Sequence, residues 1–244
     1  LLADEPRVAE SPRALEDVGK IRAAGGHLLH LIGDLLDLSK IEAGRMEIVA
    51  EPFAVAEVVE EAARTVRQLV ESNRNHLVVT VDPDAGRMIS DAFRLKQVLF
   101  NLLSNAGKFT QDGTVELQAS RVRGRGADVL VFRVADTGIG MSAEQLEKVF
   151  TPFVQGDASL TRRFGGTGLG LALSQHLARV MGGGISVSSR HRLACSPRPM
   201  RPRSWCSWEM PKRSASTITM SVALGTSTPT STTVVQISRS ISPA

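Results

Sequence analysis

Residues 101–110 read Asn-Leu-Leu-Ser-Asn-Ala-Gly-Lys-Phe-Thr, and this stretch decides the fold more than any other in the chain. It closes a helix predicted over Asp91–Phe109, in which leucine and valine recur on one face. Asn101, Asn105 and Lys108 are spaced i, i+4 and i+7, so they share another face of that helix. Amide oxygens suit Mg²⁺, and lysine offers a point charge for phosphate. Taken alone, the stretch is equally compatible with a solvated polar face at a helix end.

A second cluster, Asp136-Thr-Gly-Ile-Gly-Met141, directly follows a predicted hydrophobic strand. A carboxylate at the end of a strand can accept a hydrogen bond from an amino group. Two glycines allow the backbone to approach a flat ligand closely. An ordinary turn is the competing interpretation, because Asp and Gly are common in turns.

A third cluster, Arg162-Arg-Phe-Gly-Gly-Thr-Gly-Leu-Gly-Leu171, opens a helix predicted over Leu169–Met181. Glycines before a helix N-terminus leave backbone N–H groups available to an anion, and arginines can reach phosphate oxygens. The cluster lacks the Gly-Lys-Ser/Thr ending of a Walker A motif. A flexible loop is the competing interpretation.

In this order and at these separations, the clusters together are far more specific than each one alone. The sequence resembles the histidine protein kinases of two-component signalling, within the Bergerat-fold ATPase superfamily. The matching segments are the N box at Asn101–Thr110, the first glycine box at Asp136–Met141, the F box at Val149–Phe153, the second glycine box at Gly166–Leu171, and the second helix of the dimerisation and phosphotransfer domain at Leu35–Met46. The resemblance covers about residues 13–188.

The resemblance implies an ATP site that uses Mg²⁺ and transfers the γ-phosphoryl group to a histidine nitrogen, mainly by positioning and charge neutralisation. It implies that Asp136 binds the adenine amino group, and that Asn105 ligates Mg²⁺ with Asn101 as a second metal or phosphate contact. The phosphate-holding residues that it implies are Lys108, Arg162 and Arg163. The resemblance also implies a mobile lid over about residues 155–167. The residues that it implies around the adenine and in or beside the lid are Phe109, Gly138, Ile139, Gly140, Phe150, Phe153, Gly166, Thr167, Gly168, Leu169 and Gly170.

Two alternatives to an active kinase stay open at this point. One is a catalytically silent fragment that binds nucleotide or dimerises only. The other is a different ATPase of the same superfamily, of the chaperone or mismatch-repair type. Gln97 disfavours the second, because it stands where related ATPases carry a glutamate that activates water, and a neutral amide is a poor base.

The N-terminal part, residues 1–49, is expected to be one helix of a dimerisation hairpin. Between about 13 and 47, Ile21, Leu28 and Leu35 recur every seven residues, an apolar seam that needs a partner helix or a second copy. Gly44 is expected to end the helix. The family's acceptor histidine, which an acidic residue follows, has no counterpart. We therefore interpret His27 and His30 as packing or solvated residues and expect no autophosphorylation by the fragment alone.

Residues 50–188 are expected to form the ATP-binding catalytic domain. Beyond the helices already named, the patterning predicts a helix over 55–72 and a short one over 142–149, capped by Ser142 and Gln145. Strands are predicted at His76–Asp82, Thr114–Val122, Val129–Ala135 and Ile185–Ser188, and Glu51–Phe53 is interpreted as a connector. The fold class that follows is α+β, a two-layer sandwich with helices on one face of a mixed sheet.

Residues 189–244 break the family pattern, in which a last strand follows a glycine-rich turn. Ser and Thr make up 19 of these 56 residues, and both cysteines and both tryptophans lie here. We interpret this tail as disordered or, preferably, as the product of a frameshift, because the codons of Ser204–Pro211 encode a receiver-like buried strand two nucleotides later. The expectation is that a sheet-completing strand is missing, which would leave an aggregation-prone edge.

Composition and charge narrow the classes of function and partner that remain. The net charge of +4 arises in the tail, where residues 189–244 hold eight basic residues and one acidic residue. The basic stretch shows no periodic face, so no nucleic-acid partner is expected. Two cysteines exclude a disulfide scaffold, and no run approaches the roughly 18 apolar residues of a membrane helix. A cytoplasmic location, a homodimer in the intact protein and a response-regulator or receiver-domain partner are the expectations.

Overall fold

The computed structural model describes residues 12–123, 128–154, 167–190 and 215–223. The chain divides into two compact units, Leu1–Met46 and Glu47–Ala244.

The first unit contains one long helix, α2 (Pro12–Glu42). The heptad positions Ile21, Leu28 and Leu35 are 68%, 58% and 48% exposed, so the seam predicted from the sequence is an open apolar face. The pattern predicts a helix to about residue 47, whereas α2 ends at Glu42. Gly44, with a φ of +65°, follows this end, and the N–H of Arg45 donates to the carbonyl of Lys40.

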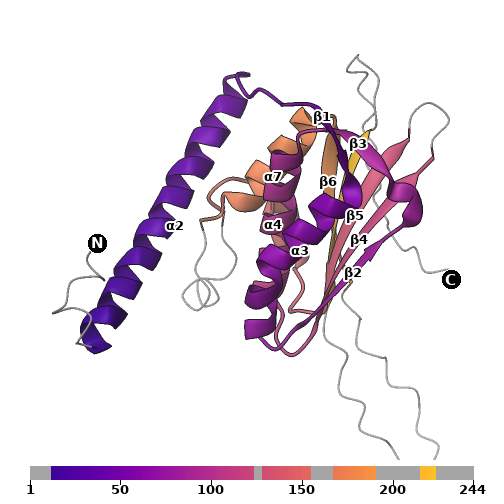
Figure 1. Ribbon diagram of the computed structural model, residues 1–244. Coiled ribbons are helices and arrows are strands. Elements are labelled where there is room, and N and C mark those ends of the chain that lie inside the picture. The colour runs from indigo at the N-terminus through magenta and orange to yellow at the C-terminus, as the bar shows by residue number, and fades with distance from the viewer. Residues whose placement is uncertain (1–11, 124–127, 155–166, 191–214, 224–244) are drawn as a thin grey trace, which may run out of the picture. The chain divides into compact units, whose positions relative to one another are not determined.

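The second unit is built on a five-stranded sheet in the order β2-β4-β5-β7-β6 (Figure 1). The strands are β2 (His76–Val81), β4 (Thr114–Val122), β5 (Val129–Asp136), β6 (Gly183–Arg190) and β7 (Ala215–Ala223). Only β2 and β4 run parallel; the other neighbours are antiparallel. The sheet is therefore mixed, as predicted.

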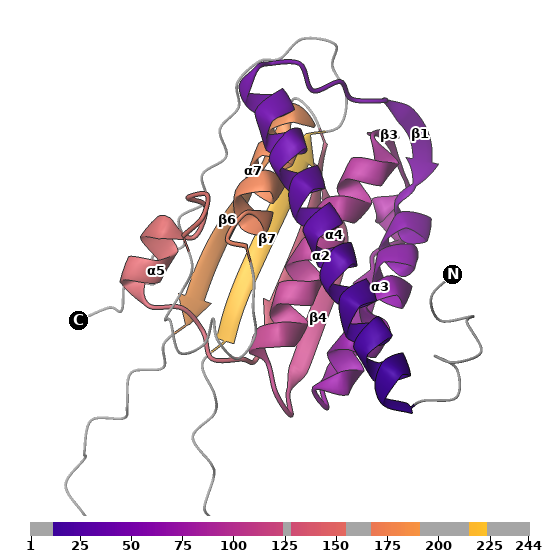
Figure 2. The same cartoon turned by 90° about the vertical axis from the view of Figure 1, so that its left-hand side faces the viewer.

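Three helices, α3 (Val55–Ser72), α4 (Ala92–Phe109) and α7 (Gly170–Val180), lie side by side over one face of the sheet (Figure 2). Alternate strand residues point into this interface; Leu117, Phe132 and Met220 are fully buried there. The two-layer α+β prediction is confirmed, and the core lies between the helices and the sheet.

Local capping signals in the sequence are borne out. At the start of α4, the Asp91 carboxylate caps the helix by accepting from the N–H of Arg94. The same carboxylate also accepts from the N–H of Val49. Helix α5 (Ala143–Lys148) begins with a complete capping box between Ser142 and Gln145.

The structure contains two short strands and one turn of 3₁₀ helix that the sequence did not predict. The supposed connector is β1 (Glu51–Ala54), which pairs antiparallel with β3 (Arg87–Ser90), and η1 (Pro83–Ala85) precedes β3. Four-residue strands offer too little alternation to be recognised, and Pro52 lowers strand propensity further.

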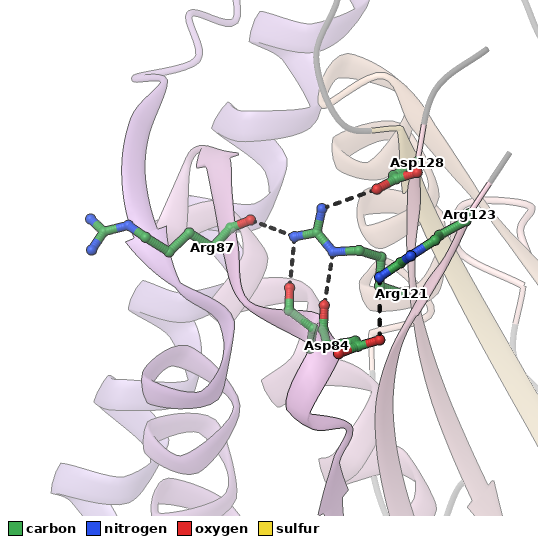
Figure 3. Close-up of polar contacts among 6 residues, drawn as sticks. Asp84, Arg87, Arg121, Arg123 and Asp128 are labelled. Carbon is green, nitrogen blue, oxygen red and sulfur yellow. Dashed lines mark hydrogen bonds and ion pairs between the residues drawn. The ribbon is translucent and has the colours of Figure 1, made fainter. Parts of the chain in front are cut away.

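The guanidinium of Arg121 links this small sheet to the large one (Figure 3). Arg121, on β4, donates to the carbonyls of Asp84, Ala85 and Arg87 at 2.8–2.9 Å, and it lies 3.5 Å from the Asp128 carboxylate. The fixed fork of arginine suits several carbonyls at once, so Arg121 fastens η1 and the start of β3 to β4.

The expectation that the sheet lacks a strand is wrong. β7 lies between β5 and β6 and pairs with both, from Ala215 to Ala223. Ile218, Met220 and Val222 alternate inward and are 7%, 0% and 1% exposed. Thr and Ser alternate with apolar residues along β7, which is the pattern of a strand with one buried face. The high Ser and Thr content of the whole tail obscured this pattern in the sequence. Ser204–Pro211, on which the frameshift interpretation depends, lie outside the described residues.

None of the described helices is both long enough and apolar enough to span a bilayer.

Candidate nucleotide-binding site

The polar face predicted on α4 exists, and its two amides are joined. The Nδ2 of Asn105 donates to the Oδ1 of Asn101 across 3.4 Å, and the Nδ2 of Asn101 donates to the Oγ of Ser174 across 2.7 Å. Asn101, Asn105 and Lys108 are all half-buried. The face is therefore ordered and only partly solvated, unlike the freely hydrated helix face that was its alternative.

Burial sets the electrostatics of Lys108. Desolvation lowers the pKa of its ammonium group below the usual 10.5, because burial disfavours the charged form. Its Nζ lies 5.2 Å from the centre of the Phe109 ring, within the range of a cation–π contact. An anion bound beside Lys108 would restore the charge that burial penalises.

The end of α4 is fixed by Asn75, a residue that sequence reasoning missed. Its Nδ2 donates to the carbonyls of Gly107 and Thr110, and its Oδ1 accepts from the N–H of Gly113. Asn75 is 3% exposed. An asparagine just before a strand looks like an ordinary turn residue, so no local signal identified it.

The Asp136 segment leaves the end of β5 and packs on the end of α4. The N–H of Gly138 donates to Asp136 Oδ1 at 2.9 Å, and the N–H of Ile139 donates to the Phe109 carbonyl at 3.3 Å. A Cβ on Gly138 would lie 2.3 Å from that carbonyl, so only glycine fits. Gly140 has a φ of +72°. The segment is thus more than an isolated turn.

The segment after the predicted lid packs on the same helix. A Cβ on Gly170, the first residue of α7, would lie 2.4 Å from Asn101 Oδ1. The N–H of Leu169 donates to Thr167 Oγ1 at 3.1 Å, and Leu169 is buried. The second glycine cluster therefore contacts the first asparagine of α4.

Gly168 also anchors the segment that precedes the predicted lid. Its carbonyl accepts from the N–H of Phe153 at 3.1 Å, and its φ is +72°. A Cβ there would lie 2.9 Å from the backbone of Phe153 and Val154. Residues 153–154 and Gly168, which lie on either side of the predicted lid, are thereby held together.

The other predicted side chains are exposed, half-buried or outside the described residues. Ile139 and Phe153 are 53% and 63% exposed, and Phe150 is half-buried. Arg162, Arg163 and Gly166 lie outside the described residues. The side chains of His27 and His30 are likewise not described.

The donor set fits Mg²⁺. Because Asn105 turns its Nδ2 toward Asn101, its Oδ1 faces the opposite way, where a hard cation could be held. In the described part of the chain, no three His, Cys, Asp or Glu side chains gather as a metal site. One or two amide oxygens are enough when phosphates complete the coordination.

Residues 90–224, more than half of the chain, match the family described as histidine kinase-, DNA gyrase B- and HSP90-like ATPase. The chain belongs to this family. The match runs to the end of β7, in agreement with the pairing of that strand.

The chain is similar to several sensor kinases. The autoinducer 2 sensor kinase/phosphatase LuxQ of Vibrio parahaemolyticus is 39% identical over 184 residues, 74% of this chain and 21% of LuxQ. Hybrid signal transduction histidine kinase B of Dictyostelium discoideum is 37% identical over 171 residues, 69% of this chain and 9% of that protein. The crystal structure of full-length ShkA in complex with AMPPNP superposes with a TM-score of 0.67 and 25% identity, over 90% of this chain and 41% of ShkA.

The chain therefore spans about a fifth or less of the length of these curated relatives. It carries the ATP-binding catalytic portion of the sensor histidine kinase family, and the silent fragment is the less favoured interpretation. The chaperone-type alternative is also disfavoured, since the matched relatives named here are sensor kinases.

Proposed function

We propose that this chain catalyses Mg²⁺-dependent transfer of the γ-phosphoryl group of ATP to a histidine outside residues 1–244, for relay to an aspartate of a response regulator. One observation carries the proposal. Asn101 contacts Gly170, and the Phe109 carbonyl accepts from the N–H of Ile139, so both glycine motifs pack against the asparagine segment of α4. A chance resemblance in sequence would not require such convergence.

Asp136 is proposed to accept a hydrogen bond from the adenine amino group, which would select ATP over GTP. Its position at the end of β5, with Gly138 folded back onto it, supports this role. The apolar residues proposed to cover the base are Phe109, Ile139, Phe150 and Phe153. The exposure of Ile139 and Phe153 supports this, because an apolar side chain without cover is available to a base.

Asn105 is proposed to present its Oδ1 to Mg²⁺, with Asn101 as a second metal or phosphate contact. Bound Mg²⁺ would supply neutralisation of the phosphate charge. Lys108, with Arg162 and Arg163 from the predicted lid, is proposed to hold the phosphates. The remaining glycines, Gly140, Gly166 and Gly168, together with Thr167, would let the backbone follow the nucleotide as the lid closes and excludes water.

The identity of residue 97 supports phosphotransfer over hydrolysis, because Gln97 stands where related ATPases carry a water-activating glutamate. Gln97, one turn before Asn101 on α4, uses its Oε1 to accept from the Arg94 guanidinium at 2.9 Å. A neutral amide engaged in this way is unsuited to remove a proton from water.

The intact protein is proposed to be cytoplasmic in this region and to dimerise through the hairpin to which α2 belongs. The exposed heptad of α2 supports a helical partner. Residues 1–49 would be the second helix of the dimerisation and phosphotransfer domain. The catalytic domain would begin at residue 50 and include β7 as well as the expected segment up to residue 188.

The test supplies the purified chain with radiolabelled ATP, Mg²⁺ and a separately produced, acceptor-bearing dimerisation and phosphotransfer domain. Acid-labile, alkali-stable phosphate should appear on the added domain and not on this chain. Asp136→Asn is the matched control and should lose the signal. Steady ATP hydrolysis without phosphorylation of the added domain would contradict the proposal.

A further inference from the structure

A buried hydroxyl on α7 holds the first asparagine of α4. The Oγ of Ser174 accepts from Asn101 Nδ2 at 2.7 Å, although the two residues are 73 positions apart. Ser174 is 2% exposed. At this depth an unmatched polar group is costly, so the pair is a specific contact rather than an incidental one.

The first turn of α7 is shaped to receive this amide. Gly170 lies one turn before Ser174, and a Cβ there would lie within 2.4–2.9 Å of the Oδ1, Cγ and Nδ2 atoms of Asn101. The missing side chain of Gly170 thus lets the amide lie against α7, where the Ser174 hydroxyl meets it.

The orientation of one amide determines the orientation of the next. An asparagine side chain has a donor on one side and an acceptor on the other. With its Nδ2 directed at Ser174, Asn101 presents its Oδ1 to the Nδ2 of Asn105. Asn105 then directs its own Oδ1 away from Asn101.

We propose that Ser174 is a positioning residue that acts through Asn101 to present the oxygen, rather than the nitrogen, of Asn105 to Mg²⁺. The inference rests on the proposed function, in which Asn105 is the metal ligand. An amide turned the other way would offer an NH₂ group, which is no ligand for Mg²⁺. The supporting contacts of a metal ligand commonly tune affinity in this way.

The experiment uses the full chain and a fluorescent, non-hydrolysable ATP analogue, titrated over a range of MgCl₂ concentrations and also in EDTA. In Ser174→Ala, the MgCl₂ concentration for half-maximal binding should rise about three- to tenfold, the effect of losing one buried hydrogen bond. Affinity in EDTA should stay within about twofold of the wild type. A role confined to stability would lower both affinities together.

Ser104→Ala is the matched control, because the Ser104 hydroxyl donates to the backbone carbonyl of Asn101 and to neither amide side chain. It should leave the Mg²⁺ dependence unchanged. If Ser174→Ala does not fold, Ser174→Cys decides, since sulfur fills the same position but is a weaker acceptor. The same direction of shift is expected.

Asn105→Ala separates failure of this inference from failure of the proposed function. Loss of Mg²⁺ dependence in Asn105→Ala, with no shift in Ser174→Ala or Ser174→Cys, overturns the positioning role alone. Unchanged Mg²⁺ dependence in Asn105→Ala overturns the proposed metal site and the inference with it. An equal loss of affinity with and without Mg²⁺ in the Ser174 variants also overturns the inference.

Discussion

Lys108 combines burial with a charge that the proposed phosphate site needs. Desolvation lowers its pKa in the free protein, whereas a bound polyphosphate would raise it. Binding of nucleotide would then be coupled to proton uptake at pH values between the pKa of the free protein and that of the complex.

The direction in which nucleotide affinity changes with pH follows from this proton uptake. Nucleotide affinity should be constant while Lys108 is charged in both states, and should fall as the pH rises through the lowered pKa of the free protein. Titrations in alkaline buffers of different ionisation enthalpies measure this proton uptake. Lys108→Arg should abolish the dependence in this range, because a guanidinium stays charged. A persistent alkaline loss in Lys108→Arg would assign the effect to another group.

Asn75 fixes the end of α4 with three hydrogen bonds and is buried. Asn75→Ala should lower the free energy of unfolding by about 2–4 kcal/mol, because two carbonyls and one N–H lose a partner inside the protein. Denaturant unfolding measures the loss.

Asn73→Ala is the matched control, since the Asn73 amide makes a single, half-buried bond to the same Gly107 carbonyl. It should cost about 1 kcal/mol. Equal effects of the two substitutions would show that Asn75 does not hold this turn.

At the level of single residues, sequence reasoning succeeded where the partner is local. The caps at Asp91 and Ser142 bond to residues three positions away, so their spacing is visible in the sequence. Asn75 and Ser174 were missed because their partners lie at least 32 and 73 positions away, respectively. Only tertiary packing brings such groups together.

At the level of elements, the long periodic helices and strands were predictable and the short or compositionally unusual ones were not. α3 and β4 have the predicted bounds, because 9 to 18 residues show their period clearly. β1 and β3 have four residues each. In β7, the apolar residues Ile218, Met220 and Val222 alternate with polar ones, but this pattern is hard to recognise within a tail rich in Ser, Thr and Pro.

The strand β7 gives a direct stability prediction. Met220 is fully buried beneath the helices, so Met220→Ala should destabilise the protein by about 2–5 kcal/mol in thermal or denaturant unfolding. Thr219→Ala is the control on the opposite face and should cost less than about 1 kcal/mol, since Thr219 is only half-buried. If both substitutions were neutral, residues 215–223 would not be part of the folded sheet.

Arg121 is the corresponding test for the small sheet. Arg121→Lys keeps the charge but cannot span three carbonyls and Asp128, so we expect a loss of about 1–3 kcal/mol in unfolding free energy. Arg123→Lys is the control, because Arg123 is exposed and forms an ion pair with the exposed Asp84 carboxylate, 3.5 Å away. Hydrogen exchange of β3 should rise in the first variant only.

At the scale of the whole molecule, the order of the motifs identified the family, and the fold explains why that order is informative. The Asn segment belongs to α4. The Asp–Gly segment at the end of β5 and the second Gly segment at the start of α7 both contact it. The signal sensed and the cognate response regulator were not predictable from these motifs, because the roles proposed for the motifs concern the nucleotide alone.

The central claim is that this chain forms a working ATP site despite its unusual tail. Calorimetric titration of the full chain with a non-hydrolysable ATP analogue and Mg²⁺, beside Asp136→Asn, tests it most directly. Micromolar-range binding that Asp136→Asn reduces at least tenfold is the predicted result. Equal binding by both proteins, or no binding by a chain that circular dichroism shows to be folded, would contradict the account.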